Sequence, residues 1–274
     1  IYEAKFGFNQ NTHRIAVGEP LGQFYGYITE GLYQVDDLNY DASTQTYTLK
    51  DGVPYHGDKG QIRPGMWKFK NLTGDDNVID ENDKTVIGNA QPKFYGGLNN
   101  SFTYKGFDLS IFLTFSYGNE VLNATKLVTS KVGSLNYNAL DVMNSSNRWM
   151  TINSDGQKVT DPGELAALNA GKTVAAYHDA QQGDNYIHSW AVEDASYLKL
   201  SNVTLGYTFP KNLIARIGLK NLRLYATGNN LLTWTKYSGF DPEVSTMKSG
   251  LTPGVDFGAY PLSRSFIFGL NVAF

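Results

Sequence analysis

Long blocks of alternating polarity constrain the fold of this chain more than any other feature. Successive side chains of a strand point to opposite faces of a sheet, so a period of two predicts a strand. Residues 107–117 carry only apolar side chains at the odd positions, and the even positions are polar except for Phe112. The last block, residues 266–274, alternates in the same way up to Phe274. Both blocks therefore predict strands with one wholly apolar face.

Four further blocks with this alternation occupy residues 2–8, 94–104, 202–209 and 222–234, the last interrupted at Asn230 and Leu231. The sequence thus predicts an all-β chain with about six long antiparallel strands. Several blocks approach the ~9 to 11 residues that cross a bilayer when tilted. Strands of ordinary globular proteins are shorter, at about 5 to 6 residues.

The spacers between these blocks alternate strictly between long and short. Counted back from the C-terminus they cover residues 235–264, 210–221, 118–201, 105–106 and 9–93. Short turns on one side and long extracellular loops on the other are typical of outer-membrane barrels. We therefore predict the C-terminal strands of a large transmembrane β-barrel, with the C-terminus on the periplasmic side.

Six strands are too few to close a barrel, because the smallest bacterial barrels have about eight and an open edge in lipid leaves backbone groups unpaired. Residues 1–274 are therefore expected to be the C-terminal segment of a barrel domain, with the other strands outside this chain. The alternative that the pattern leaves open is a secreted β-sandwich that binds glycans and transports nothing.

Composition excludes several other classes of protein. The chain has no cysteine, which rules out a disulfide scaffold, a zinc-thiolate site and a catalytic cysteine. Lysine and arginine number 23 against 26 acidic residues without a basic block, so no nucleic-acid partner is expected. The four histidines lack metal-binding spacing and no hydrolase motif is present, so the sequence does not predict an enzyme.

Four stretches resemble the SusC/RagA-type TonB-dependent outer-membrane transporters. They are residues 18–34 (GEPLGQFYGYITEGLYQ), 74–123, 197–243 and the ending YPLSRSFIFGLNVAF. The resemblance implies a barrel of about 22 strands around a plug, in the outer membrane of a Gram-negative cell, that imports oligosaccharides or peptides. The implied partners are the plug and N-terminal strands of the same transporter, a SusD-like surface lipoprotein that acts as a lid, and the TonB complex.

Aromatic residues in the long loops are the candidate contacts for a ligand or for the lid lipoprotein. Flat rings can stack on sugars or hold a peptide, but they also fill loop cores and form the girdles of barrels. The candidates are Trp149, Tyr186, Trp190, Tyr237 and Phe240. Phe274 resembles the terminal aromatic residue that the barrel assembly machinery recognises, although it could also be the last core residue of an edge strand.

The acidic run of residues 71–83 resembles a calcium-type loop of the same family. Carboxylate and amide oxygens at alternating positions suit Ca²⁺. The candidate ligands are Asp75, Asp76, Asn77, Asp80 and Asp83. Asn71 and Thr73 depart from the family pattern, so the alternative is an acidic turn held by hydrogen bonds from side chains to the backbone.

Overall fold

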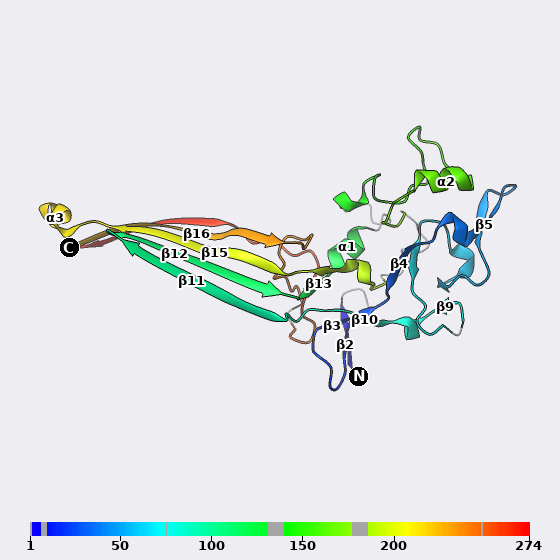
Figure 1. Ribbon diagram of the computed structural model, residues 1–274, viewed down its shortest axis with the longest axis horizontal. Helices are drawn as coiled ribbons and strands as arrows, with labels where there is room; N and C mark the ends of the chain where they lie inside the picture. The colour runs from blue at the N-terminus through cyan, green and yellow to red at the C-terminus, as the bar shows by residue number, and fades with distance from the viewer. Residues whose placement is uncertain (1, 7–9, 75, 131–139, 177–185, 248) are drawn as a thin grey trace. The chain divides into compact units, whose positions relative to one another are not determined.

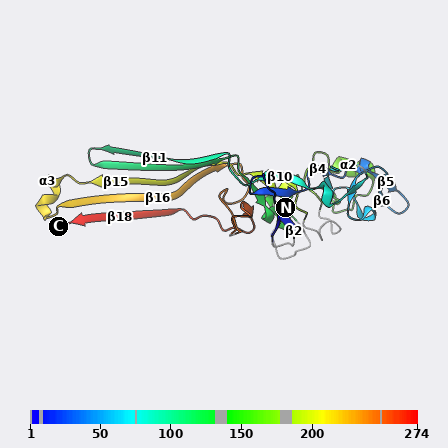
Figure 2. The same cartoon turned by 90° about the horizontal axis from the view of Figure 1, so that it is seen from below.

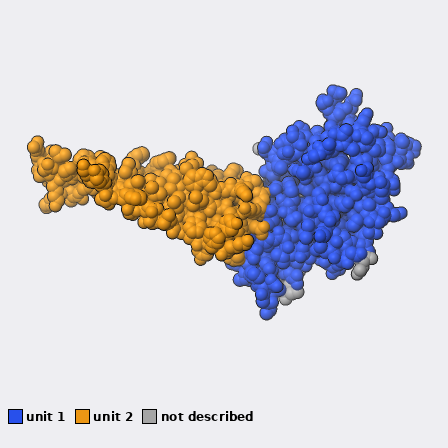
Figure 3. Space-filling view, in the orientation of Figure 1, with its two compact units in different colours: residues 1–89, 122–192, 247–257 blue, residues 90–121, 193–246, 258–274 orange. Residues whose placement is uncertain are grey.

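The chain divides into two compact units (Figure 3). The computed structural model describes residues 2–6, 10–74, 76–130, 140–176, 186–247 and 249–274. The sheet unit comprises residues 90–121, 193–246 and 258–274, and the loop unit comprises residues 1–89, 122–192 and 247–257. Each unit is described by itself below.

The sheet unit is built on one antiparallel sheet of five long strands (Figures 1 and 2). Their order in the sheet is β11 (Phe94–Tyr104), β12 (Phe107–Tyr117), β15 (Tyr197–Thr208), β16 (Asn221–Thr235) and β18 (Ser265–Ala273). The long alternating strands that the sequence predicts are confirmed, and two of them begin and end at the predicted residues.

The register places the short connections at one edge of this sheet. Tyr104 pairs with Phe107 across the two-residue turn, and Thr208 pairs with Arg223 next to the second short connection. Lys105 and Gly106 both have positive φ, 46° and 87°, as a two-residue hairpin with the right-handed twist of its strands requires. The second connection contains α3 (Lys211–Ile214) and the 3-10 turn η7 (Ala215–Ile217).

Strand β15 begins five residues earlier than the alternation predicts, because a bulge reverses its parity. Its pairing with β12 jumps from Asn202 to Leu200, so Ser201 is an extra residue and the apolar side chains upstream occupy even positions. The neighbouring strand β16 accommodates the same irregularity at Asn230, which has a φ of 51°. A bulge re-aims side chains without ending a strand, which explains why the pattern breaks while the sheet continues.

The first predicted block forms β1, and β1 pairs with β2 instead of joining the five-stranded sheet. The sheet of the loop unit has the order β1 (Tyr2–Phe6), β2 (Gln10–Ile15), β3 (Gln23–Gly26) and β10 (Thr85–Asn89). Smaller pairs are β4 (Thr29–Leu32) with β8 (Trp67–Phe69), β5 (Leu38–Asp41) with β6 (Thr46–Leu49), and β7 (Tyr55–His56) with β9 (Val78–Ile79).

The remaining elements are short. The strands are β13 (Glu120–Asn123), β14 (Val192–Asp194) and β17 (Val255–Asp256), and the α-helices are α1 (Ala124–Thr129) and α2 (Pro162–Leu168). The other 3-10 turns are η1 (Val35–Asp37), η2 (Lys59–Gln61), η3 (Glu81–Asp83), η4 (Asp141–Met143) and η6 (Ser189–Ala191). In the described part of the chain, no helix is long and apolar enough to cross a membrane.

Trp149 and Tyr33 are the largest side chains in the core of the loop unit, which brings segments far apart in the sequence together. Around them pack residues of η1, β5 and β6 and residues 159–176. Asp161 caps α2 by accepting hydrogen bonds from the backbone N–H groups of Gly163 and Glu164, at 2.9 and 3.0 Å. Of the candidate binding residues, Trp149 belongs to this core.

Candidate functional site

The two faces of the five-stranded sheet have opposite character. One face is apolar on every strand except at Asn100 of β11, and it is partly to largely exposed, with Leu270 and Phe268 of β18 at 57% and 81% exposure. The cross-strand pairs on this face include Leu98 with Leu113, Leu109 with Leu205, and Leu224 with Leu270. A soluble protein rarely leaves a continuous apolar surface of this size uncovered, so the face requires an apolar environment.

Aromatic rings mark both ends of the apolar face. At the edge with the short turns, the rings of Phe107 and Tyr207 lie 4.5 Å apart between centroids, and at the other edge those of Phe94 and Tyr117 lie 5.0 Å apart. Phe107 and Tyr117 are ten residues apart on β12. That spacing is about 33 Å of strand, or ~25 Å of height at a tilt of ~40°. This height matches the apolar band between the aromatic girdles of a transmembrane barrel.

The opposite face carries a ladder of polar side chains that bond to one another across the strands. Asn202 donates to Asn229 at 2.7 Å, and Asn229 donates to Ser265 at 3.0 Å. Thr204 and Thr227 are bonded at 2.9 Å. This polar composition is expected of a surface exposed to water, such as the lumen of a large barrel.

An ion pair links two strands on the polar face. Arg223 of β16 donates to both carboxylate oxygens of Asp108 on β12, from Nε at 3.0 Å and from Nη2 at 2.5 Å. Both side chains are about a third exposed or less. A bidentate pair of this kind satisfies the charges without placing either of them on the apolar face.

The structure brings two of the predicted loop aromatics, Tyr186 and Trp190, into one aromatic cluster of the loop unit. Trp67 of β8 lies 4.9 Å from Trp190 between ring centroids, and Phe69 lies 5.7 Å from Tyr186. Lys126 Nζ lies 4.1 Å above the ring of Trp190, a cation–π geometry. Sequence reasoning missed Trp67 and Phe69, because they reach Tyr186 and Trp190 only through the pairing of β8 with β4 and the bridge between Tyr27 and His188.

The other three predicted aromatics have different surroundings. Trp149 is 1% exposed in the core of the loop unit and lies against Gly65, where a Cβ would meet its ring at 2.4 Å from Cδ1 and Cγ, so no ligand can reach the indole face. Tyr237 is buried against Val121 and Ala195 in the sheet unit. Phe240 is 76% exposed and free to contact a ligand or a partner. Phe274 is also exposed.

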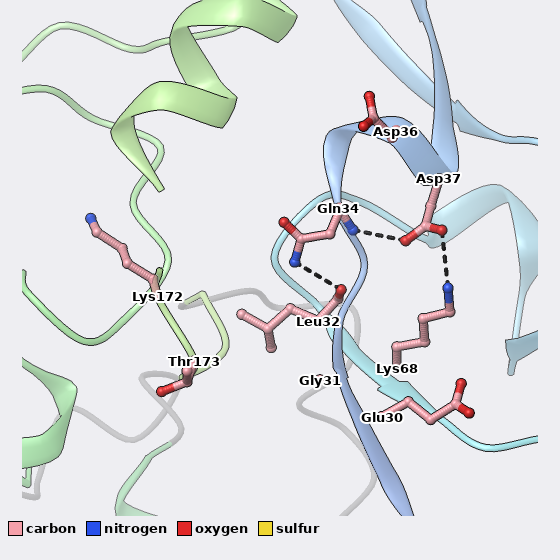
Figure 4. Close-up of a pocket in the computed structure, with 9 residues that line it drawn as sticks. All are labelled: Glu30, Gly31, Leu32, Gln34, Asp36, Asp37, Lys68, Lys172 and Thr173. Atoms are coloured by element: carbon pink, nitrogen blue, oxygen red, sulfur yellow. Dashed lines mark hydrogen bonds and ion pairs between the residues drawn. The ribbon is translucent and has the colours of Figure 1, made fainter. Parts of the chain in front are cut away.

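A cavity of about 630 Å³ opens in the loop unit (Figure 4). Glu30 of β4 and Asp36 and Asp37 of η1 line it, and Lys172 and Thr173 contribute from another segment of the chain. Lys68 neutralises Asp37 through a 3.0 Å ion pair. Burial and the charge of Arg148 lower the pKa of Lys172. The lining therefore offers separated negative and positive groups to a polar ligand. No local sequence motif predicted this cavity.

Asp83 organises the acidic loop by accepting backbone hydrogen bonds. Its Oδ1 accepts from the N–H groups of Leu72 and Thr73 at 2.6 and 3.0 Å, and its Oδ2 accepts from the N–H of Asp80 at 2.8 Å. Burial opposes ionisation of Asp83, but these hydrogen bonds outweigh it and hold its pKa below the usual range.

The other acidic side chains of this loop also bond to nearby backbone. Asp80 accepts from the N–H of Asn82 at 2.8 Å, and Asp76 accepts from the N–H of Val78 at 2.9 Å. Among the described residues no three carboxylate or imidazole side chains converge on a point where a metal ion could bind. Asn77 is exposed, and Asp75 lies outside the described residues. The described part of the loop forms a hydrogen-bonded turn, and calcium binding stays a prediction for titration to decide.

Comparison with curated proteins finds relatives over nearly the whole chain. TonB-dependent receptor P3 of Formosa agariphila is 33% identical over 97% of this chain, and TonB-dependent receptor P39 of the same organism is 31% identical over 98%. TonB-dependent receptor SusC of Bacteroides thetaiotaomicron is 29% identical over 80%. The chain spans only 23%, 26% and 18% of the lengths of these three relatives. No protein-family model matches the chain.

Solved structures with a similar fold include those of RagAB. The RagAB peptide transporter has 22% sequence identity and a TM-score of 0.59, with 92% of this chain and 22% of that chain covered. The RagAB peptide importer in its open-open state has the same identity and TM-score, with 98% and 25% covered. The fold predicted from the alternating blocks therefore has solved counterparts.

Proposed function

Because this chain is a relative of the SusC/RagA-type TonB-dependent outer-membrane transporters, we propose that it is a C-terminal part of their barrel and supplies wall and extracellular loops to a nutrient importer. The importer would act with the rest of the same transporter, meaning the plug and the N-terminal strands. Energy would come from the TonB complex of the inner membrane. The relatives are receptors and transporters, not enzymes.

The observation that carries this proposal is the five-stranded sheet with one exposed apolar face and one polar face. A β-sandwich, the alternative function class, would bury the apolar face against a second sheet. Here Phe266 and Phe268 remain mostly exposed, and aromatic rings lie at both ends of the face. A lipid environment explains both features, whereas a soluble glycan-binding sandwich would cover the apolar face and does not require aromatic rings at its two ends.

The orientation of the wall follows from the lengths of its connections. The short turns at residues 105–106 and 209–220 would face the periplasm, and the long connections would face the outside. Strand β18 then runs inward and ends at the periplasmic side, where Phe274 would serve as the signal for the barrel assembly machinery. The exposure of Phe274 in the structure supports this role, since a recognition signal has to be accessible.

The cargo would be an oligosaccharide or a peptide, enclosed between the barrel and a SusD-like lipoprotein. The RagAB relatives are described as a peptide transporter and importer, which favours a peptide. The cavity beside Glu30 and Lys172 offers charges of both signs, as the termini and side chains of peptides require. Exposed Phe240 and partly exposed Trp190 are the proposed contacts for the cargo or the lid.

The decisive experiment measures import by the complete transporter in cells. A strain that lacks the transporter should fail to take up one class of fluorescent oligomer, and uptake should return with the restored gene but not in a strain without TonB. Parallel assays with peptides and with oligosaccharides identify the cargo class. Uptake of every oligomer at the same rate with and without the transporter would reject the function.

A further inference from the structure

The connection between β15 and β16 is the only short connection of the described sheet that contains helical turns, α3 and η7. The second of these turns, η7, is capped by Gly218, which has a φ of 76°. Its position at the short-turn edge places it at the periplasmic rim of the wall. The inference below therefore rests on the proposed function.

Two large aliphatic side chains of this connection are exposed. Leu213 is 55% exposed and Ile217 is 69% exposed, whereas Ile214 between them is buried. Leu213 lies in α3 and Ile217 in the 3-10 turn η7, and these two exposed side chains of one short segment are the apolar patch of this connection. Because water is a poor solvent for such a patch, it indicates an apolar or interfacial environment.

Three cations border this patch. Lys211, Arg216 and Lys220 are all exposed, and residues 209–222 contain no acidic residue. Within the described residues none of these three side chains forms an ion pair, in contrast to Arg223 on the adjacent strand, which is neutralised by Asp108. The connection therefore presents a net charge of +3 that no acidic side chain in the described part of the chain pairs with.

The connection is continuous with the apolar face of the sheet. Phe209, its first residue, donates its N–H to the carbonyl of Leu222 at 2.9 Å, and its ring lies 5.0 Å from that of Tyr207 in the aromatic row. At the other end, Lys220 donates its N–H to the carbonyl of Ala273 at 2.7 Å. The patch therefore begins where the lipid-facing wall ends.

We propose that residues 210–220 form a membrane-surface anchor, in which Leu213 and Ile217 insert between lipids and Lys211, Arg216 and Lys220 bind the phosphates of anionic glycerophospholipids. Short amphipathic segments with apolar and basic groups bind interfaces in this way. Each cation near an anionic surface contributes about a fivefold gain in binding. The anchor would hold the rim of the wall at the level of the inner leaflet.

The position of the patch can be measured with nitroxide labels on the complete transporter in nanodiscs. Labels on Leu213→Cys and Ile217→Cys are expected to be accessible to oxygen and protected from a water-soluble nickel reagent. A label on Asn212→Cys, one residue away and outside the patch, should be accessible to nickel. Aqueous accessibility at 213 and 217, or exclusion of both reagents by a protein contact, would overturn the anchor.

A label on Ile111→Cys separates this inference from the proposed function. If the label at position 111 is also accessible to the nickel reagent, the apolar face of the sheet does not meet lipid and the proposed function is wrong. If the label at position 111 is accessible to oxygen only, while the labels at 213 and 217 are accessible to nickel, only the proposed anchor is wrong.

The charge requirement can be tested by lipid retention in native mass spectrometry with mixed phosphatidylglycerol and phosphatidylcholine. The complete transporter should retain phosphatidylglycerol preferentially. The variant K211Q/R216Q/K220Q should lose this preference by about fivefold per charge, whereas K211R/K220R should keep it. Lys236→Gln, at the opposite end of β16, is the matched control and should change nothing. An unchanged preference in the triple variant would reject the anchor.

Discussion

Asp108 and Arg223 form their ion pair across an intervening strand, and the pair passes directly over Gly206. Asp108 belongs to β12 and Arg223 to β16, while β15 runs between them. A Cβ at position 206 would lie 2.5 Å from both Arg223 Nη2 and Asp108 Oδ1, which is far inside contact distance. The absence of a side chain at Gly206 is therefore what allows strands two apart to be linked.

Substituting Gly206 should break this link. We expect Gly206→Val to destabilise the wall more than Asp108→Asn does, because the added side chain displaces both partners whereas a partly exposed ion pair contributes only about 1 kcal/mol or less. The measurement is the temperature at which the complete barrel unfolds in a gel-shift assay. Gly97→Val, at a polar-face position away from the pair, is the control, and equal effects of the two valines would contradict the explanation.

Charges on the apolar face should block assembly of the wall. Ile111→Arg and Leu270→Arg place a charge in mid-strand, which costs about 2 to 4 kcal/mol at the midplane of a bilayer. Ser110→Arg and Asn271→Arg are matched controls, since the neighbouring residues point to the polar face. The amount of transporter in purified outer membranes is the readout. Normal assembly of both apolar-face variants would show that this face does not meet lipid.

Glu243 ties the connection after β16 back to β15. It accepts hydrogen bonds from Tyr197 at 2.6 Å and from the buried Lys199. We expect Glu243→Gln to free this connection, because it leaves the ammonium of Lys199 buried without a counter-charge. Limited proteolysis of residues 236–246 measures the release. Glu164→Gln, on the surface of α2, should have no effect.

The same contact should respond to acid. Burial disfavours the charged form of Glu243, but the hydrogen bonds from Lys199 and Tyr197 outweigh it and lower its pKa from 4.5. A lowered pKa in the folded state means that the contact stabilises the protein fully above the unfolded value and loses this stabilisation as pH falls through the folded value. Proteolysis should therefore increase below about pH 4.5 in the wild type and stay constant in Glu243→Gln. The same acid response in both proteins would rule out Glu243 as its source.

Asp83 should stabilise the acidic loop whether or not the loop binds calcium. In Asp83→Asn one acceptor oxygen becomes a donor amide, so at least one of the N–H groups of Leu72, Thr73 and Asp80 loses its partner, at about 1 to 3 kcal/mol. Hydrogen exchange of these amides measures the loss. Titration of the wild-type transporter with calcium should give no saturable heat if the turn is held by hydrogen bonds alone. Stoichiometric heat that disappears in Asp76→Asn would establish the calcium site instead.

Substitutions of two loop aromatics, Phe240 and Trp149, should have opposite effects on uptake and on stability. Phe240→Ala is expected to lower oligomer uptake or lid affinity while leaving the fold intact, because its ring is exposed. Trp149→Ala should destabilise the loop unit by about 3 to 5 kcal/mol, as large-to-small changes in a core do. Paired measurements of uptake and of thermal unfolding separate the two effects. Loss of uptake without loss of stability in Trp149→Ala would make it a contact residue after all.

The sequence by itself determined the strands and their two faces. Alternation is a local property. From Phe107 to Tyr117 successive side chains of the extended backbone point to opposite faces, so the sequence predicts the apolar face without knowledge of the fold. The lengths of the spacers likewise identified which strand ends share an edge. The four motif stretches indicated the family, and the comparisons confirm that resemblance.

Only the tertiary structure decided the features that depend on residues far apart in the chain. It alone shows that Ser201 forms a bulge, since a bulge is defined against the neighbouring strands. It alone separates buried Trp149 from exposed Phe240, because burial depends on which loops pack together. The cavity beside Glu30 and Lys172 and the passage of an ion pair over Gly206 have the same origin: side chains meet there only after pairing and packing have brought distant segments into contact.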